Sequence, residues 1–144
     1  MKIKLDKNAD AVMPERAHQW DAGLDLKTPY DIVVGAFSPT NGNGKAIINT
    51  GVHVAIPEGY VGIIASKSGL NVKHDLTATG VIDSGYTGSI IVKLYNHGTE
   101  EYHFKRGDKV AQLIIMPIII PTLELVDNLE ETERGNSGFG STGK

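Results

Sequence analysis

The fold of this chain is indicated most clearly by the stretch Gly80-Val81-Ile82-Asp83-Ser84-Gly85-Tyr86-Thr87-Gly88. Its apolar start and its small turn residues are typical of two extended strands joined by a tight turn. We expect Gly85 to turn the chain through a positive φ, which glycine adopts readily. A planar base could pair with the backbone groups of such a hairpin tip. Asp83 is then a candidate general base and Tyr86 a candidate wall for a sugar, although an ordinary solvated turn explains the same residues.

Short β segments separated by turns extend in both directions from this hairpin. Val, Ile and Thr are frequent in them, and within residues 52–56 and 90–95 every second residue is Val, Ile or Leu, which places these side chains on one face. Strands are also predicted at residues 60–65, 102–104, 110–116 and 118–125, whereas at most a turn or two of helix fits around residues 70–74. This spacing predicts an all-β sandwich or barrel.

Size and charge limit the function classes. A chain of 144 residues is expected to form one domain, and it contains no cysteine for disulfides or thiol chemistry. The net charge of −3 gives no indication of a nucleic-acid polymer or an anionic membrane as partner. The longest apolar run, residues 113–120, is too short to span a membrane and is interrupted by Pro117. These features favour a cytoplasmic location.

The C-terminal residues differ from the rest of the chain. Residues 1–126 are expected to form the β domain, and residues 127–144 a flexible arm, because the arm is polar and glycine-rich with little to bury. Residues 138–143 match the spacing of a dinucleotide-binding fingerprint and much of a phosphate loop. Each of these motifs requires a strand before it and a helix after it. Because we expect no such strand and helix around residues 138–143, we reject both motifs. Glycine N–H groups, hydroxyls and Arg134 are nevertheless suited to an anion, and Phe139 to stacking on a flat ring.

Five separated stretches resemble the motifs of the trimeric dUTP diphosphatases (dUTPases), in the order of that family. They cover nearly the whole chain, which makes the resemblance specific although each motif alone is weak. The five are Ala22-Gly23-Leu24-Asp25-Leu26, Ser66-Lys67-Ser68-Gly69-Leu70, residues 80–88, Arg106-Gly107-Asp108-Lys109-Val110-Ala111-Gln112-Leu113, and residues 134–143.

The resemblance implies a jelly-roll-like β subunit in a homotrimer, with active sites between subunits and the C-terminal arm closing a site on a neighbour. It implies hydrolysis of dUTP to dUMP and pyrophosphate, which limits uracil incorporation into DNA and supplies dUMP for dTMP synthesis. Mg²⁺ is the implied cofactor. Two alternatives remain open: a dCTP deaminase-like enzyme on the same fold, and a dUTPase whose main role is to bind a regulatory protein.

The resemblance also implies residue roles. Asp83 is the base for the attacking water, Tyr86 excludes a 2′-hydroxyl, and Asp25 holds a water on the Mg²⁺ ion. The hairpin backbone over residues 76–82 pairs with uracil. The implied substrate-binding residues are Lys67, Ser68, Gly69, Gly80, Ile82, Tyr86, Gln112, Arg134, Phe139, Gly140, Ser141 and Thr142.

One departure from the family pattern matters most, and a second, Asn136-Ser137 in the fifth motif, has less consequence. Lys67 stands where the second motif usually carries Arg, so the charge is kept but the planar guanidinium fork is lost. A purely structural role is the alternative for two aspartates: Asp25 and Asp108 would each cap a turn or pair with a basic residue. For Asp108, which follows Gly107, we favour that structural role.

Overall fold

The computed structural model describes residues 1–7, 9–42 and 44–135, and almost all of its regular structure is β. The strands are β1 Lys2–Leu5, β2 Gly23–Lys27, β3 Ile32–Val34, β4 Gly44–Ala55, β5 Tyr60–Ala65, β6 Leu76–Ile82, β7 Ser89–Asn96, β8 Tyr102–Phe104 and β9 Lys109–Pro117. The short helix α1, Ser68–His74, follows β5. The predicted all-β class is confirmed, as is a helix of a turn or two near residues 70–74.

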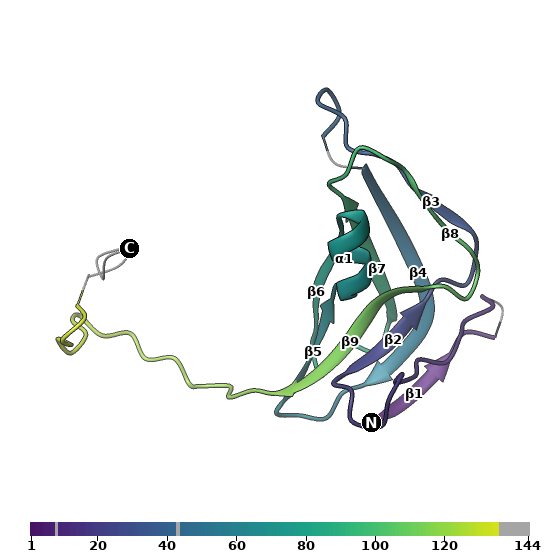
Figure 1. The fold of residues 1–144 in the computed structure, drawn as a ribbon. Helices are drawn as coiled ribbons and strands as arrows, with labels where there is room; N and C mark the ends of the chain where they lie inside the picture. The colour runs from purple at the N-terminus through teal and green to yellow at the C-terminus, as the bar shows by residue number, and fades with distance from the viewer. Residues whose placement is uncertain (8, 43, 136–144) are drawn as a thin grey trace.

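A single curled sheet forms most of the domain (Figure 1). Its seven strands lie in the order β1-β4-β7-β6-β5-β9-β2, and β3 and β8 form a separate pair. Every strand pair is antiparallel. The curl brings β7 into contact with β9 across the interior, so the sheet encloses one apolar core in the manner of the expected jelly-roll-like subunit.

The core is built from the predicted alternation. On β7, Ile90, Val92 and Leu94 are buried while Ile91 is exposed, because successive side chains of a strand point to opposite faces. Val52 and Val54 of β4 and Leu113 of β9 complete the same cluster from other strands.

The predicted hairpin is present, but its two strands separate. β6 pairs with β7 only at Leu76–Asn96, Thr77–Tyr95 and Ala78–Leu94. Beyond these pairs, residues 79–82 of β6 pair on their other side with β5, and residues 89–93 of β7 pair with β4. We call this arrangement, residues 79–93, the splayed hairpin. The edge of residues 79–82 that faces β7 therefore has no strand partner among the described residues.

The turn of the splayed hairpin differs from our expectation at Gly85. The Tyr86 amide donates to the Asp83 carbonyl over 3.0 Å, which closes a four-residue turn. Gly85 is not among the described residues with positive φ, so the prediction of a left-handed glycine here was wrong. A type I turn needs no positive φ at either central residue, which removes the reason for one.

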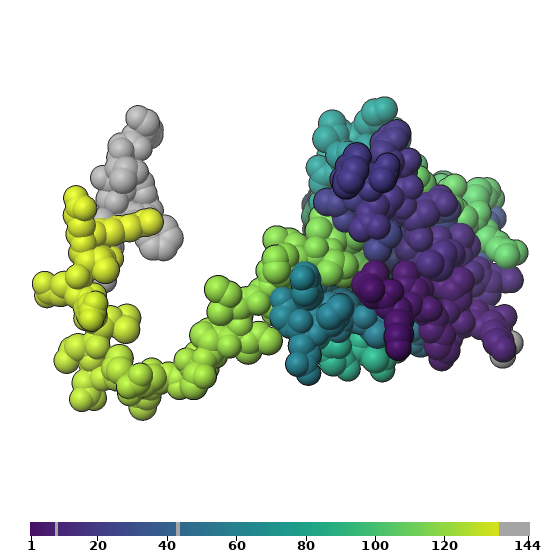
Figure 2. Space-filling model, turned by 90° about the horizontal axis from the view of Figure 1, so that it is seen from below, coloured from purple at the N-terminus to yellow at the C-terminus, as the bar shows by residue number. Residues whose placement is uncertain are grey.

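The predicted last strand, residues 118–125, was also wrong. β9 ends at Pro117, and residues 118–135 extend away from the body without forming a strand or helix (Figures 1 and 2). Ile119, Leu123 and Leu125 are 91%, 90% and 101% exposed. An apolar sequence favours an extended conformation, but a strand also needs a partner strand. Beyond the hydrogen bond from the Ile118 amide to the Gly59 carbonyl, the described residues provide none for this segment.

Candidate active site

A hollow of about 300 Å³ brings together residues from three of the recognised motifs. Asp25 comes from β2, Lys67 from the residues between β5 and α1, and Gln112 from β9. The other lining residues are Ala17, Asp21, Ala22, Gly23 and Ile114. These side chains are distant in sequence, and the strand order alone places them together.

Strand register explains why they meet. Asp25 lies opposite Gln112 in the β2–β9 pair, and Gln112 lies opposite Ala65 in the β9–β5 pair. The amide Nε2 of Gln112 donates to the Ser66 carbonyl over 2.9 Å. A Cβ at Gly23 would lie 2.1 Å from Oε1 of Gln112, so only glycine lets the Gln112 side chain fold across β2.

Asp25 is the buried charge of this hollow, with 4% of the residue exposed. Its Oδ1 pairs with the ammonium of Lys67, and its Oδ2 lies 2.6 Å from Nζ of Lys109. Burial raises the pKa of Asp25, but the hydrogen bonds and charges of Lys109 and Lys67 outweigh it and hold that pKa below its ordinary value. Asp25 is therefore an ionised anchor for two lysines.

The cluster of these three side chains carries one excess positive charge, because two ammonium groups face one carboxylate. Lys67 keeps 27% of its side chain exposed and Lys109 keeps 37%. Ser68 and Gly69, the first residues of α1, follow Lys67 directly and are exposed. This edge of the body therefore offers partly exposed cations, an amide and a hydroxyl, a set suited to phosphate oxygens.

Tyr86 is held in place at the tip of the splayed hairpin. Its hydroxyl donates to the Ser89 carbonyl over 2.9 Å. A Cβ at Gly88 would lie 2.4 Å from the Tyr86 hydroxyl oxygen, so the ring lies across Gly88 and a side chain at that position would displace it. Tyr86 remains 43% exposed, and an exposed ring held by its neighbours is suited to pack against a ligand.

The predicted base Asp83 lies apart from the hollow. It is exposed and follows Ile82, the partner of Gly62 on β5. Gln112 is the partner of Ala65 on the other side of β5. At about 3.3 Å per residue along a strand and about 4.8 Å between strands, roughly 14 Å separates the backbone positions of Ile82 and Gln112. Asp83 is also not among the residues that line the hollow, so the described residues of one copy do not place it beside Gln112.

The remaining predicted residues are placed as follows. Gly80 and Ile82 lie on β6, with Gly80 opposite Ile64 and Ile82 buried. Arg134 lies in the extended segment that leaves the body. Phe139, Gly140, Ser141 and Thr142 lie outside the described residues. Asp108 accepts a hydrogen bond from the Lys105 amide over 2.8 Å, which supports the turn-capping role that we favoured for it.

A direct protein site for Mg²⁺ is not supported by these residues. Both carboxylate oxygens of Asp25 are bonded to lysines. Within residues 1–7, 9–42 and 44–135, no three His, Cys, Asp or Glu side chains gather closely enough to hold a metal ion. Asp25 does not fit as a direct ligand, so any contact with an ion would have to pass through water.

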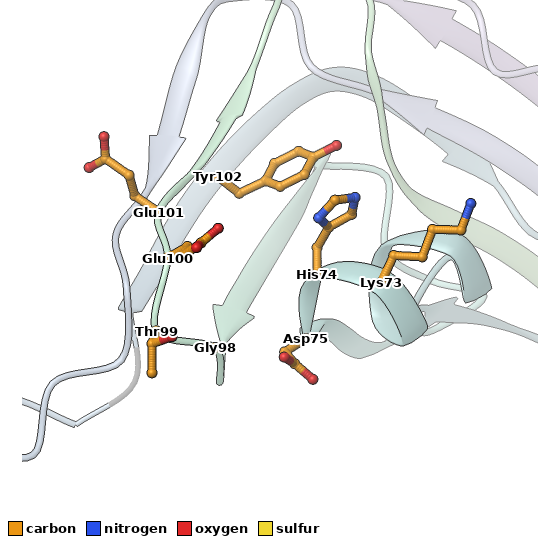
Figure 3. Close-up of a pocket in the computed structure, with 8 residues that line it drawn as sticks. All are labelled: Lys73, His74, Asp75, Gly98, Thr99, Glu100, Glu101 and Tyr102. Carbon is orange, nitrogen blue, oxygen red and sulfur yellow. The ribbon is translucent and has the colours of Figure 1, made fainter.

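A second hollow, of about 170 Å³, contains none of the predicted site residues (Figure 3). It lies between the end of α1 and the β7–β8 connection. The rings of His74 and Tyr102 pack against each other at its wall, with their centres 4.6 Å apart. Glu100 and Glu101 make its rim acidic, which does not suit a triphosphate.

Sequence reasoning missed three residues that shape the site. Gly23 and Gly88 are each required by a side chain that folds over them, and Lys109 is the second partner of Asp25. All three lie within the recognised motifs, but the motifs alone do not say which side chains pack together. Among the residues that the structure describes, no helix combines the length and the apolar character needed to cross a lipid bilayer.

Comparisons with known proteins agree with the motif order. The family model described as dUTPase matches residues 9–143. A rat deoxyuridine 5′-triphosphate nucleotidohydrolase is 42% identical over 99% of this chain, which spans 66% of the length of that relative.

Solved structures give the same result. The dUTPase of Staphylococcus bacteriophage 80alpha, in a single-residue variant with dUpNHpp, is 34% identical with a TM-score of 0.87, covering 99% of this chain and 98% of that one. A single-residue variant of the dUTPase from phage phi11 of S. aureus, described with a structural Mg(II) ion, is 33% identical with a TM-score of 0.79, covering 90% of this chain and 98% of that one. Because the family model and these relatives match nearly the whole chain, the protein belongs to the dUTPase family.

Proposed function

We propose that this chain hydrolyses dUTP to dUMP and pyrophosphate, in active sites assembled from more than one copy of the chain in a homotrimer. Membership of the dUTPase family supports the reaction. The proposal that copies of the chain share a site is supported mainly by the separation of Asp83 from Gln112 across strand β5. Two groups that act on the same phosphate must both lie within hydrogen-bond reach of it, about 3 Å each.

The splayed hairpin is the proposed site for uracil and deoxyribose. Residues 79–82 have a backbone edge without a strand partner in the described chain, and a uracil ring can take the place of the missing strand. Cytosine would present a donor where uracil presents an acceptor, and buried unpaired groups discriminate strongly. Tyr86, fixed over Gly88, would pack against the sugar and exclude a 2′-hydroxyl.

The hollow around Asp25 is the proposed phosphate site of a neighbouring copy. Gln112 would contact the α-phosphate, and Ser68 and Gly69 the β-phosphate. Lys67 and Lys109 give this edge its positive charge, although both are bonded to Asp25 in the free chain. Lys67 would therefore act on phosphate as a point charge that Asp25 positions.

The proposed reaction is an in-line displacement by water. The Asp83 carboxylate accepts a proton as the water oxygen bonds to the α-phosphorus, and the bond from that phosphorus to the bridging oxygen breaks. Pyrophosphate leaves with the electron pair of that bond. Mg²⁺, when chelated by the triphosphate, would neutralise charge on the leaving group, and substrate phosphates with waters can supply most of its ligands.

The extended C-terminal segment is proposed as the arm that closes a site on a neighbouring copy. Its exposed Ile119, Leu123 and Leu125 have no partner in the described chain, and burial against another copy would remove them from water. We propose contacts of Arg134, Ser141 and Thr142 with the γ-phosphate, of Phe139 with uracil, and of Gly140 through its backbone. Residues 1–126 and 127–144 would then act as body and arm.

A pyrophosphate-release assay across the deoxynucleoside triphosphates and UTP tests the reaction most broadly. We expect release from dUTP alone, in the presence of Mg²⁺. Ammonia release from dCTP without pyrophosphate would instead favour a deaminase, which no observation here supports. A regulatory protein partner remains a separate prediction, to be tested by pull-down with and without dUTP. The cytoplasmic location likewise remains a prediction, to be tested by cell fractionation.

A further inference from the structure

His53 is the one described histidine side chain whose two ring nitrogens both contact oxygen atoms that can only accept a hydrogen bond. Its Nδ1 lies 2.8 Å from the Thr87 carbonyl oxygen, in the turn of the splayed hairpin. Its Nε2 lies 3.0 Å from Oδ1 of Asp6. A carbonyl and an ionised carboxylate have no proton to donate, so both bonds must be donated by the ring.

An irregularity in strand β4 directs His53 toward the turn. Asn49 pairs with Ile91 and His53 with Ser89, so four steps along β4 face two along β7. Gly51 accommodates this bulge with a φ of +67°, and its carbonyl accepts a hydrogen bond from the Asp6 amide over 2.9 Å. Bulges frequently redirect side chains beside functional sites. Here the bulge places His53 between Asp6 and Thr87.

We propose that His53 is a positioning residue, which ties the hairpin turn to β4 only while both of its ring nitrogens carry a proton. The inference rests on the proposed role of the neighbouring Tyr86 as the sugar wall. A neutral imidazole has one N–H, and the bond to ionised Asp6 is the stronger of the two. Loss of a proton therefore leaves Nδ1 and the Thr87 carbonyl as two acceptors 2.8 Å apart, and the turn must move away.

The other groups around His53 do not replace this tie. Lys4 lies directly opposite on β1, and Lys2 and Lys4 line the same surface hollow. Asp6 is the carboxylate that faces the ring, and from the turn only the neutral Thr87 carbonyl does so in the described chain. A histidine ordinarily changes charge between pH 5 and 8. The protonation of the ring therefore decides whether this hydrogen bond to the turn is made.

A change in the position of the turn would alter the proposed sugar site, because Tyr86 directly precedes Thr87. The Tyr86 ring is also held by its bond to Ser89, whose hydroxyl contacts Asn49 of β4. Loss of the bond from His53 to Thr87 removes one of the links between β4 and the turn. We expect the preference for dUTP over UTP to fall about three- to tenfold as His53 loses its proton, the size expected for one hydrogen bond.

The test combines ring NMR with kinetics on the full chain from pH 5.5 to 8.5. Ring ¹⁵N shifts report the protonation of His53, amide signals of residues 86–88 report the turn, and the ratio of kcat/KM for dUTP to that for UTP reports the sugar site. We expect all three to change with one midpoint. In His53→Gln the turn signals and the ratio should be constant with pH, with the ratio at the high-pH level of the parent.

His103→Gln is the matched control, because His103 pairs with exposed Glu101, far from the turn in sequence. In this variant the turn signals and the ratio of kcat/KM values should depend on pH as they do in the parent. If the amide signals of residues 86–88 do not change as His53 loses its proton, His53 does not hold the turn. This result would contradict the proposal whether or not dUTP is the substrate. Turn signals that follow His53 while the ratio stays constant would overturn the positioning role. A pH-dependent ratio that persists in His53→Gln would overturn it as well.

Discussion

Asp83 and Gln112 lie on opposite sides of strand β5 and at different positions along its length. Asp83 follows the partner of Gly62, whereas Gln112 is the partner of Ala65. The proposed base and the proposed α-phosphate ligand therefore belong to different surfaces of one chain. A catalytic site that uses both would take one of them from a second copy, which agrees with the homotrimer that we propose.

Replacement of the proposed base should abolish turnover while leaving binding intact. Asp83→Asn keeps the shape of the side chain but removes the proton acceptor, and Asp83 is exposed, so folding should not suffer. We expect kcat for dUTP to fall by about 10²–10⁴-fold, with the substrate Kd within a few-fold of the parent. Asp108→Asn, at a turn-capping aspartate, is the control and should retain kcat. Near-parental turnover in Asp83→Asn would exclude Asp83 as the base.

Tyr86 should control discrimination between deoxyribose and ribose. Tyr86→Ala opens space over Gly88, so the ratio of kcat/KM for dUTP to that for UTP should fall, whereas stability should change little because the ring is 43% exposed. Tyr86→Phe keeps the ring but loses the bond to the Ser89 carbonyl, and it should retain most of the discrimination. The sugar-wall role is wrong if Tyr86→Ala keeps the parental ratio.

Asp25 should stabilise the fold at neutral pH and lose that effect in acid. Its pKa in the folded chain lies below the ordinary value of 3.8. Its contribution is therefore complete above pH 3.8 and is lost as pH falls through the lower folded pKa. Asp25→Asn should lower the free energy of unfolding by about 1.5–3 kcal/mol at pH 7, as for hydrogen bonds to charged groups.

Urea unfolding of the parent and of Asp25→Asn, from pH 7 to pH 2, measures this effect. The difference between the two proteins should shrink below about pH 4. Asp31→Asn removes another carboxylate whose pKa is lowered, here by hydrogen bonds from Lys105 and Arg106. Asp31 is exposed, so its removal should change stability little. A difference that stays constant with pH would show that Asp25 does not stabilise through its charge.

Deletion of residues 134–144 should impair catalysis without unfolding the body. The sheet and its core lie within residues 2–117, so the midpoint of thermal unfolding should stay close to that of the parent. Loss of a closing segment should mainly lower kcat, because closure excludes water and positions the substrate. Unchanged kinetics after the deletion would remove the arm from the active site.

Local sequence patterns predicted the strands but not all of their partners. The alternation of Ile90, Val92 and Leu94 identified β7 because a half-buried strand repeats every two residues. Residues 118–125 are equally apolar, yet they form no strand, because pairing depends on a partner that the local sequence does not identify. The position of Gly85 suggested a left-handed turn, but the turn from Asp83 to Tyr86 closes without a positive φ at Gly85.

The sequence motifs predicted which residues belong to the candidate site, but not how these residues are arranged in space. The motifs identified Asp25, Lys67 and Gln112, and strand register then brought these three together. The pairing of Lys109 with Asp25 follows from the β2–β9 register, which no local pattern reveals. The separation of Asp83 from Gln112 also depends on strand order. Sequence therefore indicated the candidate residues, while the fold shows that Asp83 does not line the hollow that contains the other three.

Mixed oligomers of two defective chains test the shared site most directly. One chain carries Asp83→Asn, and the other carries Ser68→Ala with Gln112→Ala, so that each pure protein lacks a different half of the site. After co-expression at equal levels, mass spectrometry of the intact oligomer verifies mixing, and dUTP turnover is measured. If a site takes Asp83 from one copy and Ser68 and Gln112 from another, roughly a quarter of the sites should be complete, since each intact half comes from about half of the subunits. We predict recovery near that level. Verified mixed oligomers that remain as inactive as the pure variants would contradict the account, because every site would then draw both halves from the same chain.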